Sequence, residues 1–331
     1  MKIFAVFIGG SAVYYFVHLE QVPETGRWRF MDINPKFETR LAQEAQAELV
    51  REFHGKVLPP NHPLTRHVRR VVTRILDSNN LGHLKDTEAP FLASQANRDS
   101  NGTEGGDHPD DWVISGLRRG EEVAPGAGGR EWNLMVVNDD KVVNAMATYG
   151  NVIVFTGILP VCKDEQGLAA VLGHEIGHVV ARHASENYSR MKILLFVATL
   201  LNIAGLDFGF SRLLTKLLVD LPNSRLMETE ADKIGLRLSA KACYDPRAAP
   251  EVFTRMGQLE KAQGRINLDF LYTHPASSKR VEALNEMLHE AYAIQAATPE
   301  CGQTTSYMEA FRDVFGSVKS PISSGAEWRF N

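Results

Sequence analysis

The sequence predicts a mainly helical α+β fold. Apolar residues recur at helical spacing through residues 38–78 and again through most of the chain after residue 166, whereas short β-branched runs occupy residues 132–159. The composition agrees, because 331 residues that are 44% hydrophobic and 23% charged provide ample chain to bury a core. The same proportions exclude wholesale disorder.

Charge and cysteine content exclude further classes of protein. The chain carries 36 basic and 40 acidic residues, so it lacks the basic excess that nucleic-acid binders usually show, and no nucleic-acid partner is expected. Its three cysteines, Cys162, Cys243 and Cys301, are far apart and odd in number, which argues against a disulfide framework. With no Cys-x-x-Cys pair, a bound metal would have to be held by histidine and carboxylate.

An apolar segment, IFAVFIGGSAVYYFV, occupies residues 3–17. As a helix it reaches about 22 Å, short of the roughly 30 Å hydrocarbon core of a bilayer. Three interpretations compete: a membrane anchor, a secretory signal peptide and a buried core segment. Tyr14 and Tyr15 suit a membrane interface, and we expect residues 1–20 to form an N-terminal membrane anchor.

The rest of the chain divides into a linker, one large domain and a tail. Turn signals over 21–37 indicate a linker, residues 38–295 form the expected domain, and residues 296–331 form a tail. Within the domain, residues 95–130 are rich in Gly, Asp, Glu and Pro and predict a flexible insertion. A second apolar run indicates either a membrane-associated segment over 193–210 or a core helix hairpin.

Regular elements inside this domain follow from the periodicity. Two amphipathic helices, interrupted by a proline-rich break, are predicted over residues 38–78. Strands are predicted over 132–159, a helix from Gln166, a second helix from Pro222 to about Ala242, and further helices through residues 246–293.

The sequence His174-Glu175-Ile176-Gly177-His178 lies within the helix that begins at Gln166. Histidines at positions i and i+4 share one helix face, so both imidazoles can bind one zinc ion, and the intervening glutamate can act as general base. Strongly apolar surroundings suit a helix buried beneath an active site. The pattern predicts a zinc hydrolase site with His174 and His178 as ligands and Glu175 as base.

A catalytic zinc ion needs a third protein ligand. Glu228 and Asp232 are four residues apart on the next long helix and share a face, so Glu228 is the expected ligand and Asp232 the expected hydrogen-bond partner of a ligand histidine. Glu230 points away from that face, so we expect it to face solvent or to pair with an arginine. His183 is five residues beyond His178 and is expected to be structural.

HEIGH followed by SRLMETEAD resembles the pattern HExxH then ExxxD of the gluzincin peptidases in the HtpX and CAAX prenyl-protease superfamily. Further blocks between residues 18 and 284 resemble one branch, the mitochondrial inner-membrane metalloendopeptidases whose activity overlaps with that of the m-AAA protease. The resemblance implies a zincin-like metallopeptidase domain with a small mixed sheet whose edge strand faces the active-site helix. It also implies one Zn²⁺ per chain.

The resemblance implies additional roles for particular residues. His274 matches a late histidine that stabilises the oxyanion, which gives it a catalytic role beside Glu175. Asn144, Ala145 and the strand that begins at Asn151 match the edge strand that pairs with an extended substrate. Arg225 and Arg280 match positions that brace the helices.

The function we expect is that of a membrane-anchored zinc endopeptidase. By resemblance, its substrates are proteins of the mitochondrial inner membrane, cleaved in quality control and stress response, with the catalytic domain facing the intermembrane space and the chain forming a homo-oligomer. Two alternatives stay open. One is a secreted or periplasmic-type zinc peptidase, and the other is a catalytically silent zinc-bound scaffold, against which an intact Glu175 argues.

Overall fold

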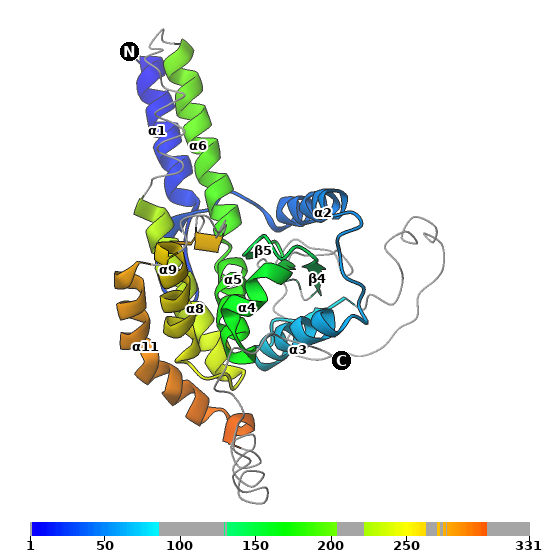
Figure 1. Ribbon diagram of the computed structural model, residues 1–331. Coiled ribbons are helices and arrows are strands. Elements are labelled where there is room, and N and C mark those ends of the chain that lie inside the picture. Colours follow the sequence, from blue (N-terminus) through cyan, green and yellow to red (C-terminus); the bar gives the residue numbers. More distant parts are fainter. Residues whose placement is uncertain are drawn as a thin grey trace, which may run out of the picture.

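The computed structural model describes residues 2–85, 129, 131–203, 222–262, 270–271, 274–275 and 277–302. Helices surround a small four-stranded sheet, so the mainly helical α+β prediction is confirmed (Figure 1). The expected insertion over 95–130 lies outside the described residues except for residue 129. The same holds for the end of the 193–210 segment and for the tail beyond residue 302.

The two amphipathic helices predicted for residues 38–78 are confirmed as α2 (Pro35–Glu52) and α3 (Pro63–Ser78). Each begins with proline, whose fixed φ and missing N–H suit the first turn. The side chain of Asn34 caps α2 by accepting from the backbone N–H of Phe37, and His62 caps α3 in the same way. The apolar face of α3 is fully buried against the core of the domain.

The main sheet has four strands in the order β3-β4-β6-β5. Their bounds are β3 (His83–Leu84), β4 (Glu131–Val137), β5 (Ala145–Thr148) and β6 (Asn151–Phe155). β3, β4 and β6 are parallel, and β5 pairs antiparallel with β6 at the edge. The expectation that the strand beginning at Asn151 is the edge strand was therefore wrong, because β6 lies between β4 and β5.

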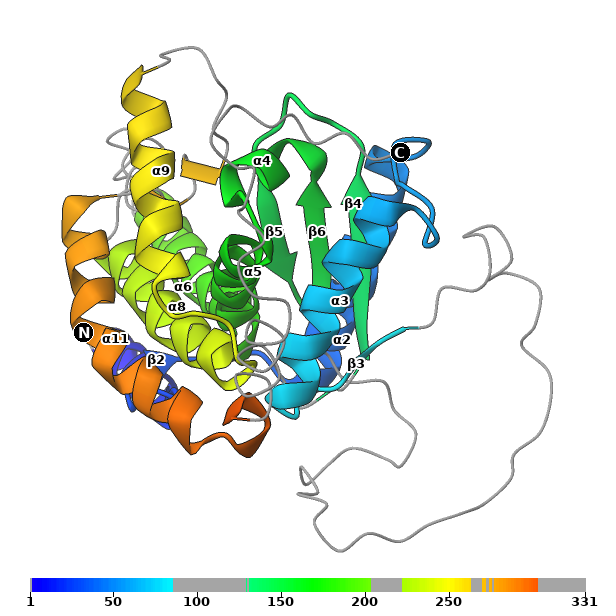
Figure 2. The ribbon, with the colours of Figure 1, turned by 60° about the horizontal axis from the view of Figure 1, so that its bottom comes forward.

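Helix α5 (Glu165–Val180) occupies the centre of the domain. Figure 2 shows it between β5 on one side and the helices α8 (Pro222–Lys241) and α9 (Ala248–Ala262) on the other. It follows a short helical turn at Thr156–Ile158 and α4 (Leu159–Cys162), and it precedes α6 (His183–Ile203). The last long helix, α11 (Ser278–Ala297), packs against α8 and α9.

Glycines let α5 and α8 approach until their backbones touch. A Cβ atom on Gly235 would lie 2.6 Å from the backbone nitrogen of His174, and one on Gly173 would lie 2.8 Å from the carbonyl oxygen of Gly235. Real Cβ atoms essentially never approach backbone that closely, so neither position accepts a side chain without movement of a helix. This contact brings the histidines of α5 within reach of the carboxylates of α8.

The segment expected as a linker is instead an ordered hairpin. Strands β1 (Leu19–Gln21) and β2 (Trp28–Phe30) pair antiparallel directly after α1 (Lys2–Val17). Val22 is fully buried and Phe30 nearly so, and the guanidinium of Arg29 donates to the carbonyl oxygen of Ala181 at the end of α5. We refer to residues 18–30 as the N-terminal hairpin.

Helices α1 and α6 both extend from the same end of the molecule (Figure 1). Asp32 joins their bases, because it accepts a hydrogen bond from Tyr14 on α1 and forms an ion pair with Lys192 on α6. Beyond that point both helices expose large apolar side chains, among them Val13 and Leu195. Among the described residues, no helix is both long and apolar enough to cross a membrane.

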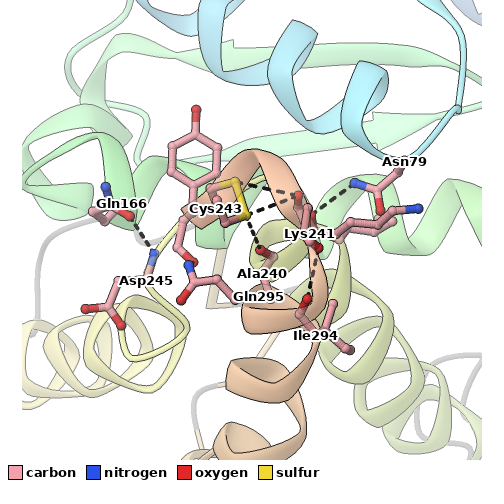
Figure 3. Close-up of a disulfide and its surroundings, with 12 residues drawn as sticks. Asn79, Gln166, Ala240, Lys241, Cys243, Asp245, Ile294 and Gln295 are labelled. Atoms are coloured by element: carbon pink, nitrogen blue, oxygen red, sulfur yellow. Dashed lines mark hydrogen bonds between the residues drawn. A yellow bond between two sulfur atoms is a disulfide. The ribbon is translucent and has the colours of Figure 1, made fainter. Parts of the chain in front are cut away.

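Cys243 and Cys301 form a disulfide, which corrects the expectation drawn from the cysteine count. Figure 3 shows the bond beside Ala240 and Lys241 at the end of α8. The cysteines are 58 residues apart, and the bond ties the end of α8 to the chain that follows α11. Cys162 is buried and has no disulfide partner.

Candidate metal centre

His174 and His178 project from one face of α5 toward α8. Their Nε2 atoms lie 3.2 Å apart, and their rings meet at nearly a right angle. His174 is 2% exposed, because α5 is buried on almost every face. Two imidazole nitrogens at this separation can bind one ion.

Helix α8 supplies two carboxylates at the same point. The oxygens of Glu228 lie 3.4 Å from Nε2 of His174 and 3.3 Å from Nε2 of His178. Asp232, one turn later, lies 3.0 Å from the other ring nitrogen of His174. The predicted i, i+4 pair therefore faces the histidines. Glu228 lies beside the Nε2 atoms of both histidines, and Asp232 lies on the opposite side of the His174 ring.

His274 and Glu175 complete the cluster. Nδ1 of His274 lies 2.8 Å from Oε1 of Glu228, and its Nε2 lies 3.4 Å from Oε1 of Glu175. The other carboxylate oxygen of Glu175 accepts a 3.2 Å hydrogen bond from the backbone N–H of Ala147 on β5. The structure thus brings together all five residues that sequence analysis placed at the metal or in catalysis.

The donor set fits a zinc ion. Ligand atoms from His174, His178, Glu228 and His274 all lie within 4.8 Å of one another. One buried oxygen of Glu228 and one of Glu175 have no hydrogen-bond partner, which is costly unless another group completes the site. Imidazole and carboxylate are the ligands of catalytic zinc in sites that contain no cysteine.

Burial governs the protonation of this cluster. It lowers the pKa of His178 to about 3, which keeps that imidazole neutral, as a metal ligand must be. It also raises the pKa of Glu175, as suits a group that must take up a proton. For His174 the effect of burial is outweighed by the carboxylates of Asp232 and Glu228, which raise its pKa to about 9 in the metal-free site.

Arg280 braces the cluster from α11, as the resemblance implied. Its guanidinium donates to Asp232 at 2.5 and 2.7 Å and lies 3.0 Å from Glu228. It also covers the ring of Phe253 at 4.0 Å, so it joins α8, α9 and α11. Arg225, by contrast, is exposed on α8, away from these contacts.

A cleft of about 390 Å³ runs between β5 and the metal-binding face of α5. Asn144 and Ala145 line it together with His178 and His274. Asn151 does not, because its side chain is 1% exposed and bonds Asn133 on the neighbouring strand. Among the described strands, β5 is the one at the edge of the sheet that borders the cleft.

Three further residues lie behind His178, and sequence analysis assigned none of them a functional role. His183 contacts His178, Glu230 contacts His183, and Arg27 of the N-terminal hairpin contacts Glu230. Glu230 was expected either to face solvent or to pair with an arginine. It pairs with an arginine, and its side chain is buried. The only sequence signal was the pair of alternating arginines in GRWRF, which suggests no particular partner.

The geometry accords with comparisons to known proteins. The model of peptidase family M48 matches residues 113–288, more than half of the chain. The chain belongs to peptidase family M48. This confirms the resemblance to the gluzincins, and with it a zinc metalloendopeptidase, in which the group of histidine and glutamate side chains described above could hold the ion.

Individual relatives agree with this membership. The mitochondrial metalloendopeptidase OMA1 of Schizosaccharomyces pombe is 36% identical over 94% of this chain and 79% of its own length. The protein of that name from Saccharomyces cerevisiae is 29% identical over 94% of this chain and 80% of its own. The human metalloendopeptidase OMA1 is 29% identical over 86% of this chain and 48% of its own.

Proposed function

We propose that this M48 peptidase is a membrane-anchored endopeptidase of mitochondria that cleaves proteins of the inner membrane. The observation that carries the proposal is the convergence of two histidines, two glutamates and a third histidine beside a free strand edge. Such a site holds a metal, a base and a place for an extended peptide within one cleft.

His174, His178 and Glu228 are the proposed zinc ligands. They contribute two imidazole nitrogens and one carboxylate, which leaves one coordination position open. Zinc, when bound, polarises the scissile carbonyl and brings the pKa of a water toward neutrality. Asp232 fixes the ring of His174 by accepting from its Nδ1–H.

Glu175 is the proposed general base. Ala147 holds one of its carboxylate oxygens, while the other lies in the cleft with no hydrogen-bond partner. That oxygen is free to take a proton from the attacking water and then deliver it to the leaving amine.

His274 is the proposed electrophilic partner. Its ring lies between Glu175 and Glu228 and is 13% exposed on the cleft side. From there an imidazole N–H can donate to the oxygen on which negative charge develops as the carbonyl is attacked.

β5 is the proposed docking strand for substrate. An edge strand presents unpaired backbone groups, so an extended peptide can add to it by main-chain hydrogen bonds. Asn144 and Ala145 lie at the start of this edge, within the cleft. Recognition through backbone groups depends little on side chains and suits unfolded segments of many proteins.

The proposed location rests on the names of the relatives and on the exposed apolar helices. The relatives are named mitochondrial, and α1 with the outer part of α6 presents the apolar surface expected of membrane contact. We propose residues 1–20 as an anchor, 193–210 as a membrane-associated segment and the rest as the catalytic domain, facing the intermembrane space. Homo-oligomerisation is part of the same proposal.

The test is cleavage of an unfolded model protein by the full chain in detergent, alongside Glu175→Gln, with metal quantified in both. The proposal expects one zinc in each protein and cleavage by the wild type alone. Zinc in both without cleavage would indicate a scaffold. Absence of zinc from both would contradict the assignment of the ligands.

A further inference from the structure

A chain of polar side chains runs from the N-terminal hairpin to His178. Nδ1 of His178 lies 2.8 Å from Nδ1 of His183, and Nε2 of His183 lies 3.0 Å from Oε2 of Glu230. Arg27 donates to the same carboxylate oxygen at 2.7 and 3.1 Å. We call Arg27, Glu230 and His183 the relay.

The relay is buried and its charges are compensated. The side chains of His183 and Glu230 are each 4% exposed and that of Arg27 is 21% exposed. Arg27 also pairs with the buried Glu186 at 2.6 Å, so one guanidinium bridges two carboxylates from α6 and α8. Glu230 also accepts a hydrogen bond from Thr25 of the hairpin, so its carboxylate is contacted by the side chains of Thr25, Arg27 and His183.

Hydrogen-bond directions along this chain can be assigned from the contacts. The carboxylate of Glu230, paired with Arg27, accepts, so Nε2 of His183 carries a hydrogen toward it, and we assign Nδ1 of His183 as the acceptor that faces His178. Nδ1 of His178 must then carry a hydrogen and donate to His183. The lone pair of His178 is then on Nε2. This atom lies 3.3 Å from Glu228 and faces the other proposed ligands.

We propose that the relay positions the metal ligand His178, so that zinc affinity depends on docking of the N-terminal hairpin. The inference rests on the proposed role of His178 as a ligand. The relay does for His178 what Asp232 does for His174, since a ligand histidine is oriented by the acceptor of its second N–H. Because the hairpin follows α1 directly, the end of the proposed anchor is joined to a segment that contacts the metal centre through Glu230 and His183.

The test measures zinc affinity of the full chain in detergent by competition with a chromophoric chelator. Its variants are Arg27→Gln, Glu230→Gln and His183→Phe. Lys192→Gln is the matched control, because the Lys192–Asp32 pair also ties the N-terminal segment to α6 but leads to no ligand. The visible spectrum of the Co²⁺-substituted proteins reports ligand geometry independently of activity.

We expect each relay variant to bind zinc about 10–100-fold more weakly and to shift the Co²⁺ bands, with Lys192→Gln unchanged. Arg27→Lys, which keeps the charge but not the two-carboxylate bridge, should recover part of the loss. If the relay variants match the wild type in zinc affinity and Co²⁺ spectrum, the inference is overturned but the proposed function is not. A wild type that takes up no zinc would overturn the proposed function as well.

If Arg27→Gln does not fold, Glu230→Gln decides the question, because it preserves the shape of the side chain and removes only its charge. The apo-protein melting temperatures separate positioning from general stability. Without metal, Glu230→Gln should melt below Lys192→Gln because it breaks a buried ion pair, so the deciding quantity is the rise in melting temperature on adding zinc, which should be smaller for Glu230→Gln. Equal responses to zinc would contradict the relay.

Discussion

Gly235→Ala should damage the metal centre although the residue is no ligand. The added Cβ would lie 2.6 Å from the backbone nitrogen of His174 and 2.7 Å from the carbonyl carbon and oxygen of Gly173. All three atoms belong to the backbone of α5, so no side chain can swing aside. Restoring an ordinary contact requires α8 to move away by at least about 0.8 Å.

Two energy terms oppose each other in this variant. Alanine improves helix propensity by about 1 kcal/mol, whereas overpacking of a tight contact costs about 1–3 kcal/mol. We expect a modest net loss of stability, on the order of 1 kcal/mol. Activity should suffer more, because α8 carries Glu228 and Asp232, and a displacement of about 1 Å at a catalytic site costs on the order of 100-fold in rate.

The assay pairs thermal unfolding with cleavage of an unfolded protein and metal content. Gly302→Ala is the control, since nothing lies within 4 Å of a Cβ at that helical position. It should leave cleavage unchanged and stabilise the protein slightly. A Gly235→Ala protein with wild-type cleavage and zinc content would refute the argument that close helix contact sets the ligand geometry.

The remaining predictions concern other parts of the molecule. His274→Ala should keep zinc and lose about 100–1,000-fold in kcat, measured with metal content in parallel; loss of the ion would instead make this histidine a ligand. Replacing Cys243 and Cys301 by serine should destabilise the chain by about 4 kcal/mol in urea unfolding, because the bond closes a loop of 58 residues; an unchanged midpoint would contradict this. The folded pKa of Glu230, about 2, is below its ordinary value of 4.5, so its charge adds stability above pH 4.5 that is lost as pH falls toward 2. The gap in melting temperature between metal-free wild type and Glu230→Gln should therefore narrow over that range, and a constant gap would count against the buried ion pair. Removing zinc by chelation should abolish cleavage and lower the melting temperature, with both restored by Zn²⁺ alone; cleavage that survives chelation would exclude a zinc mechanism.

The metal-binding residues were predictable because their geometry is local. His174 and His178 share a face of one helix, as do Glu228 and Asp232 on another, and helical periodicity alone places each pair. The convergence of the pairs depends on the contact at Gly173 and Gly235, for which a single sequence offers no separate signal.

The sheet edge was misplaced because the strand that begins at Asn151 was assigned to the edge by resemblance, without weighing its continuous apolar run. The residues of β6, NVIVF, are buried at every position, which is typical of an interior strand with neighbours on both sides. β5 is shorter and half-exposed, as edge strands often are. A continuous β-branched run thus indicated an interior position.

Pairings between residues far apart in the chain could not be predicted from the sequence for a different reason. The disulfide joins cysteines 58 residues apart, and Arg27 meets Glu230 across 203 residues. Spacing does not encode such partners, because they depend on how helices stack. The hairpin was therefore taken for a linker, and His183 for a structural residue.

The disulfide also determines what happens when the chain is cut. His274 and Arg280 both lie between Cys243 and Cys301, so any single break from residue 244 to 300 leaves two fragments joined through sulfur. In electrophoresis without a reducing agent, the two fragments migrate as one molecule. They separate only when the disulfide is reduced. A chain nicked in this loop thus keeps all of its proposed catalytic groups in one covalent molecule.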